Sequence, residues 1–212
     1  MKTVYLISGL GADYRAFRFL ELKNCEIIHI HWIQPEKGET IQAYATRLLL
    51  QIKNPAPILI GLSFGGMIAI EIGKLIETRK IILISSAQTK DELPSYFRLA
   101  GWLRIDGLIP VRFLKKINPL VDWAFGVSNA DEKSMLASFL EATSSSFMKW
   151  AIHVIVHWKN EIRLNNVVCI HGTNDRILPK TKAEYYVKDG GHLMILNKHR
   201  EISHLINTLI HE

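Results

Sequence analysis

The sequence has few cysteines and no long apolar segment. Cys25 and Cys169 are the only cysteines among 212 residues, and their spacing matches no metal-binding or redox motif, so we expect two reduced, buried thiols. No run approaches the roughly 18 apolar residues that span a bilayer, which predicts no membrane span. The short apolar run at 4–7 is followed closely by Gly9 and Gly11, and therefore predicts a first strand rather than a signal peptide. A cytoplasmic location is the resulting expectation.

A concentrated basic segment is also missing. The formal net charge is +6 and the pI is near 9.3, but lysine and arginine are spread along the chain and never form a run longer than two residues. The sequence contains no zinc-finger spacing, RNA-binding aromatic signature or basic helix, so we expect no nucleic-acid partner. A content of 48% hydrophobic and 22% charged residues excludes a disordered or fibrous chain and favours a folded globular protein.

Short apolar runs rich in β-branched residues alternate with segments of helical periodicity. This alternation is typical of a parallel sheet covered by helices on both faces. Helices are predicted at 40–52, with Thr40 as N-cap, at 65–77 and at 199–210. Strands are predicted at 4–8, 26–30, 58–61, 80–84, 166–171 and 184–187. The length suits one core, so residues 1–212 are interpreted as a single α/β domain.

The alternation breaks at about 88–163, which contains amphipathic helical patterns and no convincing strand. Four of the five tryptophans and five of the eight phenylalanines lie in this segment. Because strands resume at about 166, we interpret the segment as a helical cap laid over the C-terminal edge of the sheet. Most of its aromatic side chains are expected to pack the cap, and the rest to line an apolar pocket.

The strongest local motif is Gly-Leu-Ser-Phe-Gly-Gly at 61–66, between a predicted strand and a predicted helix. A serine nucleophile on a sharp strand-to-helix turn needs small residues two positions before and after it, where backbones approach closely. Gly61 and Gly65 meet this requirement around Ser63. The start of a helix beside Ser63 also supplies a positive dipole end suited to developing negative charge.

A base and an orienting acid follow in the order that such a serine requires. Asp175 ends the polar turn after the strand at 166–171, at the sheet edge where open α/β folds bind ligands. His192 follows Gly190 and Gly191, which free the loop to bring the imidazole over Ser63. A serine hydroxyl is a poor nucleophile alone, and this set predicts a Ser63, His192, Asp175 catalytic triad.

These motifs together resemble the α/β-hydrolase superfamily, specifically its small esterase-like members with a helical cap. GLSFGG, HGTND and GGHL match the family's nucleophile, acid and histidine motifs in order, from about Val4 to the C-terminus. The resemblance implies an α/β-hydrolase fold with a reduced, mostly parallel sheet of about six strands flanked by helices, without the family's leading antiparallel hairpin. It also implies that the backbone N–H groups of Leu10 and Phe64 form the oxyanion hole. The chain has Ser8-Gly9 where the family commonly has His-Gly, which leaves the support of that loop open.

The expected activity is hydrolysis of a carboxylic ester or thioester through an acyl-Ser63 intermediate. The expected partner is a small-molecule substrate with an apolar acyl or aromatic part, and no metal or organic cofactor is expected. Amide, lactone and carbon–carbon bond hydrolysis remain open, and a second interpretation is a non-catalytic relative that binds a small ligand or a protein. His153 and His157 are spaced for one helix face, but with no acidic third ligand nearby we interpret them as part of a cap helix.

Overall fold

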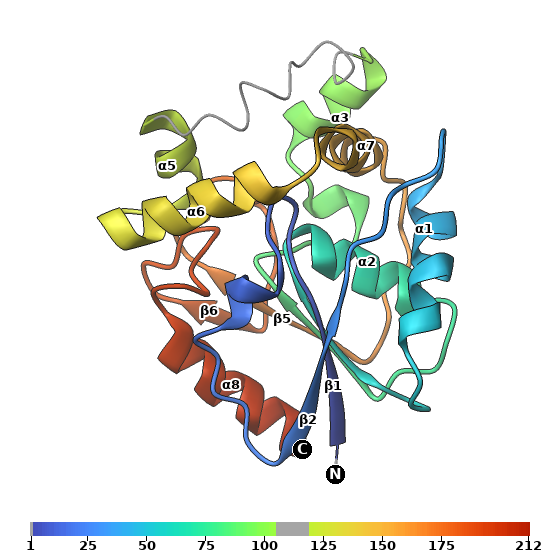
Figure 1. Cartoon of the computed structure of the whole chain (residues 1–212), viewed down its shortest axis with the longest axis vertical. Helices are drawn as coiled ribbons and strands as arrows, with labels where there is room; N and C mark the ends of the chain where they lie inside the picture. Colours follow the sequence, from blue (N-terminus) through green and yellow to red (C-terminus); the bar gives the residue numbers. More distant parts are fainter. Residues whose placement is uncertain (1, 105–118) are drawn as a thin grey trace.

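The computed structural model describes residues 2–104 and 119–212 and contains a six-stranded sheet in which all neighbouring strands are parallel (Figure 1). The strand order is β2-β1-β3-β4-β5-β6. The strands are β1 (Lys2–Ile7), β2 (Cys25–Ile30), β3 (Ile58–Leu62), β4 (Lys80–Ile84), β5 (Val167–Gly172) and β6 (Tyr185–Val187). Each bound lies within two residues of the prediction, so the predicted sheet is confirmed, and it is parallel throughout rather than mostly parallel.

Helices on both faces of the sheet bury its side chains. They include α1 (Ile41–Leu48), α2 (Phe64–Gly73) and α8 (His199–His211). Alternate residues of a strand point to opposite faces. Val4 and Leu6 of β1 therefore pack in the core formed with α8, whereas Tyr5 and Ile7 pack in the core formed with α1 and α2. Figure 1 shows α8 on one side of the sheet and α1 and α2 on the other.

The predicted helices are confirmed, with one difference in length. Thr40 caps α1 by accepting a hydrogen bond from the Ala43 N–H at 3.2 Å, and a 3₁₀ turn η2 (Leu49–Gln51) continues α1 almost to the predicted end. Helix α2 ends at Gly73, earlier than the predicted end at 77. Glycine is a weak helix former, and β4 lies so close that a Cβ on Gly73 would be 2.4 Å from the Ile81 side chain.

The described part of 88–163 is helical and contains no strand. It comprises η3 (Lys90–Glu92), α3 (Ser95–Trp102), α5 (Pro119–Phe125), α6 (Ala130–Ala142) and α7 (Ser145–Val156). Asn129 and Ser144 cap α6 and α7, because their side chains accept hydrogen bonds from N–H groups in the first turns. The α helices of this segment lie at the end of the sheet opposite the N-terminus, above the C-terminal ends of the strands (Figure 1). Across residues 2–104 and 119–212, no helix is long and apolar enough to cross a membrane.

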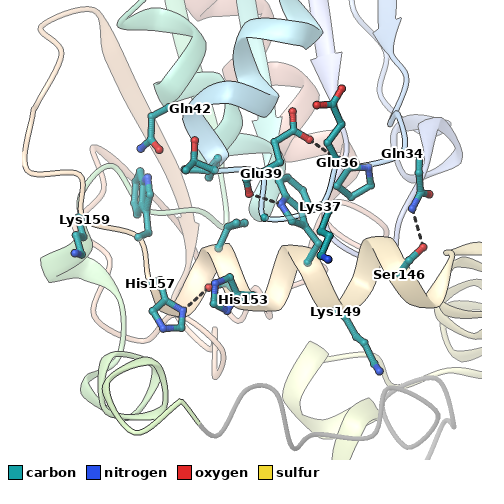
Figure 2. A pocket seen from close by; sticks show the side chains of 17 residues that line it. Gln34, Glu36, Lys37, Glu39, Gln42, Ser146, Lys149, His153, His157 and Lys159 are labelled. Carbon is teal, nitrogen blue, oxygen red and sulfur yellow. Dashed lines mark hydrogen bonds between the residues drawn. The ribbon is translucent and has the colours of Figure 1, made fainter.

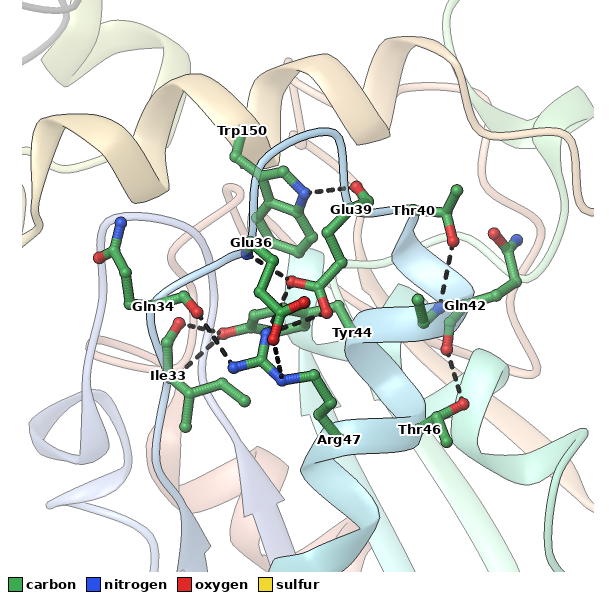
Figure 3. A network of polar contacts seen from close by, with 11 residues as sticks. Ile33, Gln34, Glu36, Glu39, Thr40, Gln42, Tyr44, Thr46, Arg47 and Trp150 are labelled. Atoms are coloured by element: carbon green, nitrogen blue, oxygen red, sulfur yellow. Dashed lines mark hydrogen bonds and ion pairs between the residues drawn. The ribbon is translucent and has the colours of Figure 1, made fainter.

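A network of polar contacts connects α7 to the segment between β2 and α1 (Figure 3). The Trp150 Nε1–H of α7 donates to the Glu39 carbonyl at 2.8 Å, and the Glu39 carboxylate accepts from Arg47 of α1 at 2.8 Å. The Tyr44 hydroxyl donates to the Ile33 carbonyl at 2.8 Å and accepts from the Ile33 N–H at 3.0 Å. These bonds fix the position of α7 relative to α1, and hence relative to the adjacent helix α2.

Candidate active site

Ser63 stands on a sharp turn between β3 and α2. Its φ of 51° lies in the left-handed region, which is strained for a residue other than glycine. A Cβ on Gly61 would lie 2.4 Å from the Gly66 Cα, and a Cβ on Gly65 would lie 2.2 Å from the Ile7 carbonyl oxygen. Only glycine fits these two positions, as the sequence motif predicts.

Backbone and side-chain hydrogen bonds hold this turn in place. The Ser63 N–H donates to the Ile84 carbonyl of β4 at 2.9 Å, and the Ser86 hydroxyl donates to the Ser63 carbonyl at 2.6 Å. Phe64 is the first residue of α2, so its N–H belongs to the first turn, whose N–H groups have no acceptor within the helix. The positive end of the helix dipole therefore lies beside the Ser63 side chain.

The structure brings the three residues of the predicted triad into one chain of hydrogen bonds. Ser63 Oγ lies 2.8 Å from His192 Nε2, and His192 Nδ1 lies 2.8 Å from Asp175 Oδ2. Because a carboxylate only accepts, Nδ1 carries the proton of the neutral imidazole. Nε2 is then the acceptor, and the Ser63 hydroxyl donates to it. This arrangement gives the serine a base that can remove its proton.

Asp175 is held as a buried, ionised carboxylate. It follows β5 and is only 5% exposed, and its Oδ1 accepts the backbone N–H groups of Ile177 and Leu178 at 2.9 Å each. Burial by itself raises the pKa of this carboxyl group, but the interactions with His192, the Leu178 N–H and His171 outweigh burial, and the resulting pKa is below the ordinary value. Asp175 therefore remains negative and can stabilise a positively charged imidazole.

The loop that carries His192 packs against the end of α5. The Leu193 N–H donates to the Phe125 carbonyl at 2.9 Å, and the Phe125 ring meets the His192 ring edge to face at 5.7 Å. Gly126 has a φ of 71°, and a Cβ on it would lie 2.8 Å from the Gly191 Cα. Two glycines thus allow close contact between the two backbones, and the end of α5 holds the His192 loop in position.

A second histidine, which the sequence reasoning did not select, lies beside the Asp175 carboxylate. His171 of β5 is buried, and its Nε2–H donates to the Leu178 carbonyl at 3.0 Å while lying 3.3 Å from Asp175 Oδ2. Its Nδ1 is buried without a hydrogen-bond partner among the described residues. Burial lowers the pKa of His171, so the ring is neutral. The sequence could have indicated His171, because it lies four residues before the predicted acid and near the end of a predicted strand.

The loop after β1 is closed by two side chains that share one acceptor. The Ala12 N–H donates to the Gly9 carbonyl at 3.1 Å, which forms a turn around Leu10. Both the Ser8 hydroxyl, at 2.9 Å, and the Trp32 Nε1–H, at 3.2 Å, donate to the Ala12 carbonyl. Trp32 also stacks on the ring of Phe64, with 5.6 Å between ring centroids. Ser8 therefore supports the loop where the family commonly has His-Gly, and Trp32 connects this loop to the start of α2.

A small cavity of about 20 Å³ adjoins Ser63 and His192. Apart from these two residues its lining is apolar, and it includes Leu10 of the β1 loop together with side chains from β3, α5, α6 and the His192 loop. Its lining residues are Gly9, Leu10, Gly11, Ala12, Leu62, Ser63, Phe125, Leu136, Phe139, His192 and Leu193. The cavity therefore lies between the catalytic candidates and the helices above the sheet.

His153 and His157 lie away from this cavity, in a groove of about 850 Å³ between residues 34–42 and α7 (Figure 2). Their ring centroids are 4.2 Å apart, and the His157 Nδ1–H donates to the His153 carbonyl at 2.8 Å. Within the described ranges, no group of three or more His, Cys, Asp or Glu side chains could hold a metal ion. The structure therefore separates these two histidines from the predicted triad.

Comparison with known proteins gives matches at the level of structure. No protein-family model matches the chain, and no curated protein matches its sequence. An esterase from Exiguobacterium antarcticum superposes with a TM-score of 0.73 at 14% identity, covering 100% of this chain and 92% of the esterase. A bromoperoxidase from Bacillus anthracis superposes with a TM-score of 0.70 at 16% identity, covering 100% of this chain and 92% of the bromoperoxidase. MenH from S. aureus superposes with a TM-score of 0.72 at 16% identity, covering 99% of this chain and 93% of MenH.

Proposed function

We propose that this chain, which has the α/β-hydrolase fold predicted from its sequence, is a serine hydrolase that cleaves carboxylic esters or thioesters through an acyl-Ser63 intermediate. The observation that carries the proposal is the continuous hydrogen-bonded chain from Ser63 through His192 to Asp175, with 2.8 Å at each step. Each member comes from a different loop at the C-terminal edge of the sheet, where ligands bind in open α/β folds.

The first half-reaction forms the acyl-enzyme. Ser63 Oγ attacks the substrate carbonyl carbon while its proton passes to His192 Nε2, and Asp175 stabilises the imidazolium that results. The carbonyl oxygen becomes an oxyanion, for which the backbone N–H groups of Leu10 and Phe64 are the proposed donors. Collapse of the tetrahedral intermediate breaks the bond to the leaving group, which takes the proton from His192 Nε2.

Water completes the reaction in the second half. His192 Nε2, again unprotonated, accepts a proton from water as the water oxygen attacks the acyl carbon. Breakdown of the second intermediate returns the proton to Ser63 Oγ and releases the carboxylic acid. Every proton transfer uses one nitrogen, so the tautomer that Asp175 fixes serves both halves.

The segment 88–163 is proposed as a cap that shapes the substrate site. Phe125 of α5 and Leu136 and Phe139 of α6 line the cavity at Ser63, and they favour an apolar acyl or aromatic part in a small-molecule substrate. The esterase among the structural matches agrees with ester hydrolysis, although one fold supports many chemistries. A non-catalytic ligand-binding module is the alternative, and it predicts no turnover of any activated ester.

A fluorophosphonate probe tests the nucleophile directly. We expect intact-mass and peptide analysis to locate one label on Ser63 and none in Ser63→Ala. In a parallel assay of p-nitrophenyl acetate hydrolysis, Ser63→Ala or His192→Ala should lower the rate by about 10³-fold or more. An unlabelled but folded wild-type protein, or equal turnover by Ser63→Ala, would refute the proposal.

A further inference from the structure

The cavity beside Ser63 is small for a site that must hold the acyl part of a substrate. Its volume is about 20 Å³, whereas about 10–15 Å³ is the least that holds one water molecule. The acyl group stays bonded to Ser63 through both half-reactions of the proposed mechanism, while the leaving group departs. An acyl group that occupies this cavity is therefore limited in size by it.

Core side chains of α6 form part of the cavity wall. Leu136 and Phe139 line the cavity and are 2% and 1% exposed, and both belong to the same hydrophobic core as Leu62 of β3 and Leu193. The Arg15 guanidinium covers the Phe139 ring at 5.2 Å. Close-packed cores change shape only at a cost in stability, so this wall does not yield freely to a longer chain.

The next turn of α6 fixes the helix against the loop after β1. Leu140 is buried, and its Cδ2 lies 2.8 Å from the position that a Cβ on Gly11 would take. Leu140 does not line the cavity. Helix α6 thus cannot move outward from Ser63 without losing the packing of Leu140 on this loop.

Four larger cavities among the described residues share little or no lining with the cavity at Ser63. The groove of about 850 Å³ beside α7 shares no lining residue with the cavity at Ser63. A cavity of about 250 Å³ near Trp32 shares only Ala12 with it, and two cavities of about 680 and 590 Å³ beside α6 share no lining residue with it. Among these cavities, the space that reaches the nucleophile is therefore confined to the small one.

From this geometry we infer that the substrates are esters or thioesters of very short acyl groups, with acetyl as the preferred group, and that Leu136 and Phe139 set this limit. The inference rests on the proposed function and adds the substrate class. One methylene that a pocket cannot accommodate changes kcat/KM by about tenfold or more. Acetyl esters should therefore be cleaved at least about tenfold better than butyryl esters, and octanoyl esters more slowly still.

The experiment compares kcat/KM for p-nitrophenyl acetate, butyrate and octanoate in the wild-type protein and in three variants. Leu136→Ala and Phe139→Ala enlarge the cavity and should lower the acetate-to-butyrate ratio by about tenfold or more. Leu209→Ala is the matched control, because it removes the same atoms as Leu136→Ala from a buried leucine of α8 in the same core, and Leu209 does not line the cavity. Its ratio should equal that of the wild type.

The ratio separates specificity from damage to the fold, because loss of folded protein lowers both rates equally. Circular dichroism and thermal melts identify any variant that does not fold. If Leu136→Ala does not fold, Leu136→Val replaces it, and we expect a smaller decrease in the acetate-to-butyrate ratio. Butyrate or octanoate turnover equal to that of acetate in the wild type would overturn the inference and leave the proposed function intact. A wild-type protein that cleaves none of the three esters and takes no fluorophosphonate would overturn both.

Discussion

Two glycines, Gly172 and Gly190, allow the loops that carry Asp175 and His192 to approach each other closely. A Cβ on Gly172, at the end of β5, would lie 2.1 Å from the Gly190 carbonyl oxygen and 2.5 Å from its carbon. The Asn174 N–H donates to that same oxygen at 2.9 Å, so the two loops are joined by this contact. Gly172→Ala should therefore push the loops apart, and its effect can be worked out from these distances.

Real Cβ atoms essentially never approach other heavy atoms within 3.0 Å, so Gly172→Ala requires a displacement of about 0.9 Å at the Gly190 oxygen. If this displacement reaches His192, the 2.8 Å bond from His192 Nδ1 to Asp175 lengthens to about 3.7 Å, beyond hydrogen-bond range. The expected loss in kcat/KM then approaches that for removing the acid, about 10³- to 10⁴-fold. The overpacking itself should cost about 1–3 kcal/mol of stability.

Steady-state hydrolysis of p-nitrophenyl acetate, with thermal melts on the same samples, measures both effects. The control is Gly38→Ala, since Gly38 has a φ of 71° and a Cβ there would meet nothing within 4 Å. Alanine at that φ should cost about 1 kcal/mol of stability and leave kcat/KM unchanged. A Gly172→Ala variant with the kcat/KM and melting temperature of the wild type would show that the loops are not held by this contact.

Two further predictions concern residues that support the proposed machinery. Trp32→Phe keeps a ring against Phe64 but removes the hydrogen-bond donor to the Ala12 carbonyl. We expect kcat to fall about tenfold with little change in KM, because the proposed oxyanion contacts strengthen only in the transition state. An unchanged kcat would contradict this role of Trp32. Burial lowers the pKa of His171 below 6.5 despite the opposing effect of Asp175, so just below that pH the unfolded chain binds more protons than the folded protein. The stability of the wild-type protein, measured as the urea midpoint of unfolding, should therefore fall as the pH drops from about 7 to 5, and it should fall less in His171→Gln. If the urea midpoints of the two proteins depend on pH in the same way, the buried His171 ring is not neutral.

Local sequence patterns determined the sheet and the turn at Ser63. Strand periodicity, β-branched runs and the cap at Thr40 act over a few residues, and the structure reproduces them closely. Gly61 and Gly65 could be recognised because the backbone contacts that require glycine follow from any sharp strand-to-helix turn. Helix α2 ended earlier than predicted because the close approach of β4 to Gly73 comes from a contact across the fold.

By itself, the sequence determined the α/β-hydrolase fold and the order of Ser63, Asp175 and His192 along the chain. Tertiary structure alone decided that these three side chains meet at hydrogen-bond distance, that α5 holds the His192 loop, and that Trp32 bonds to the loop after β1. It also decided the small volume at Ser63, which depends on how α6 packs. These features arise between residues far apart in the chain, and no local periodicity or propensity encodes such distances, because they follow from how the whole core packs.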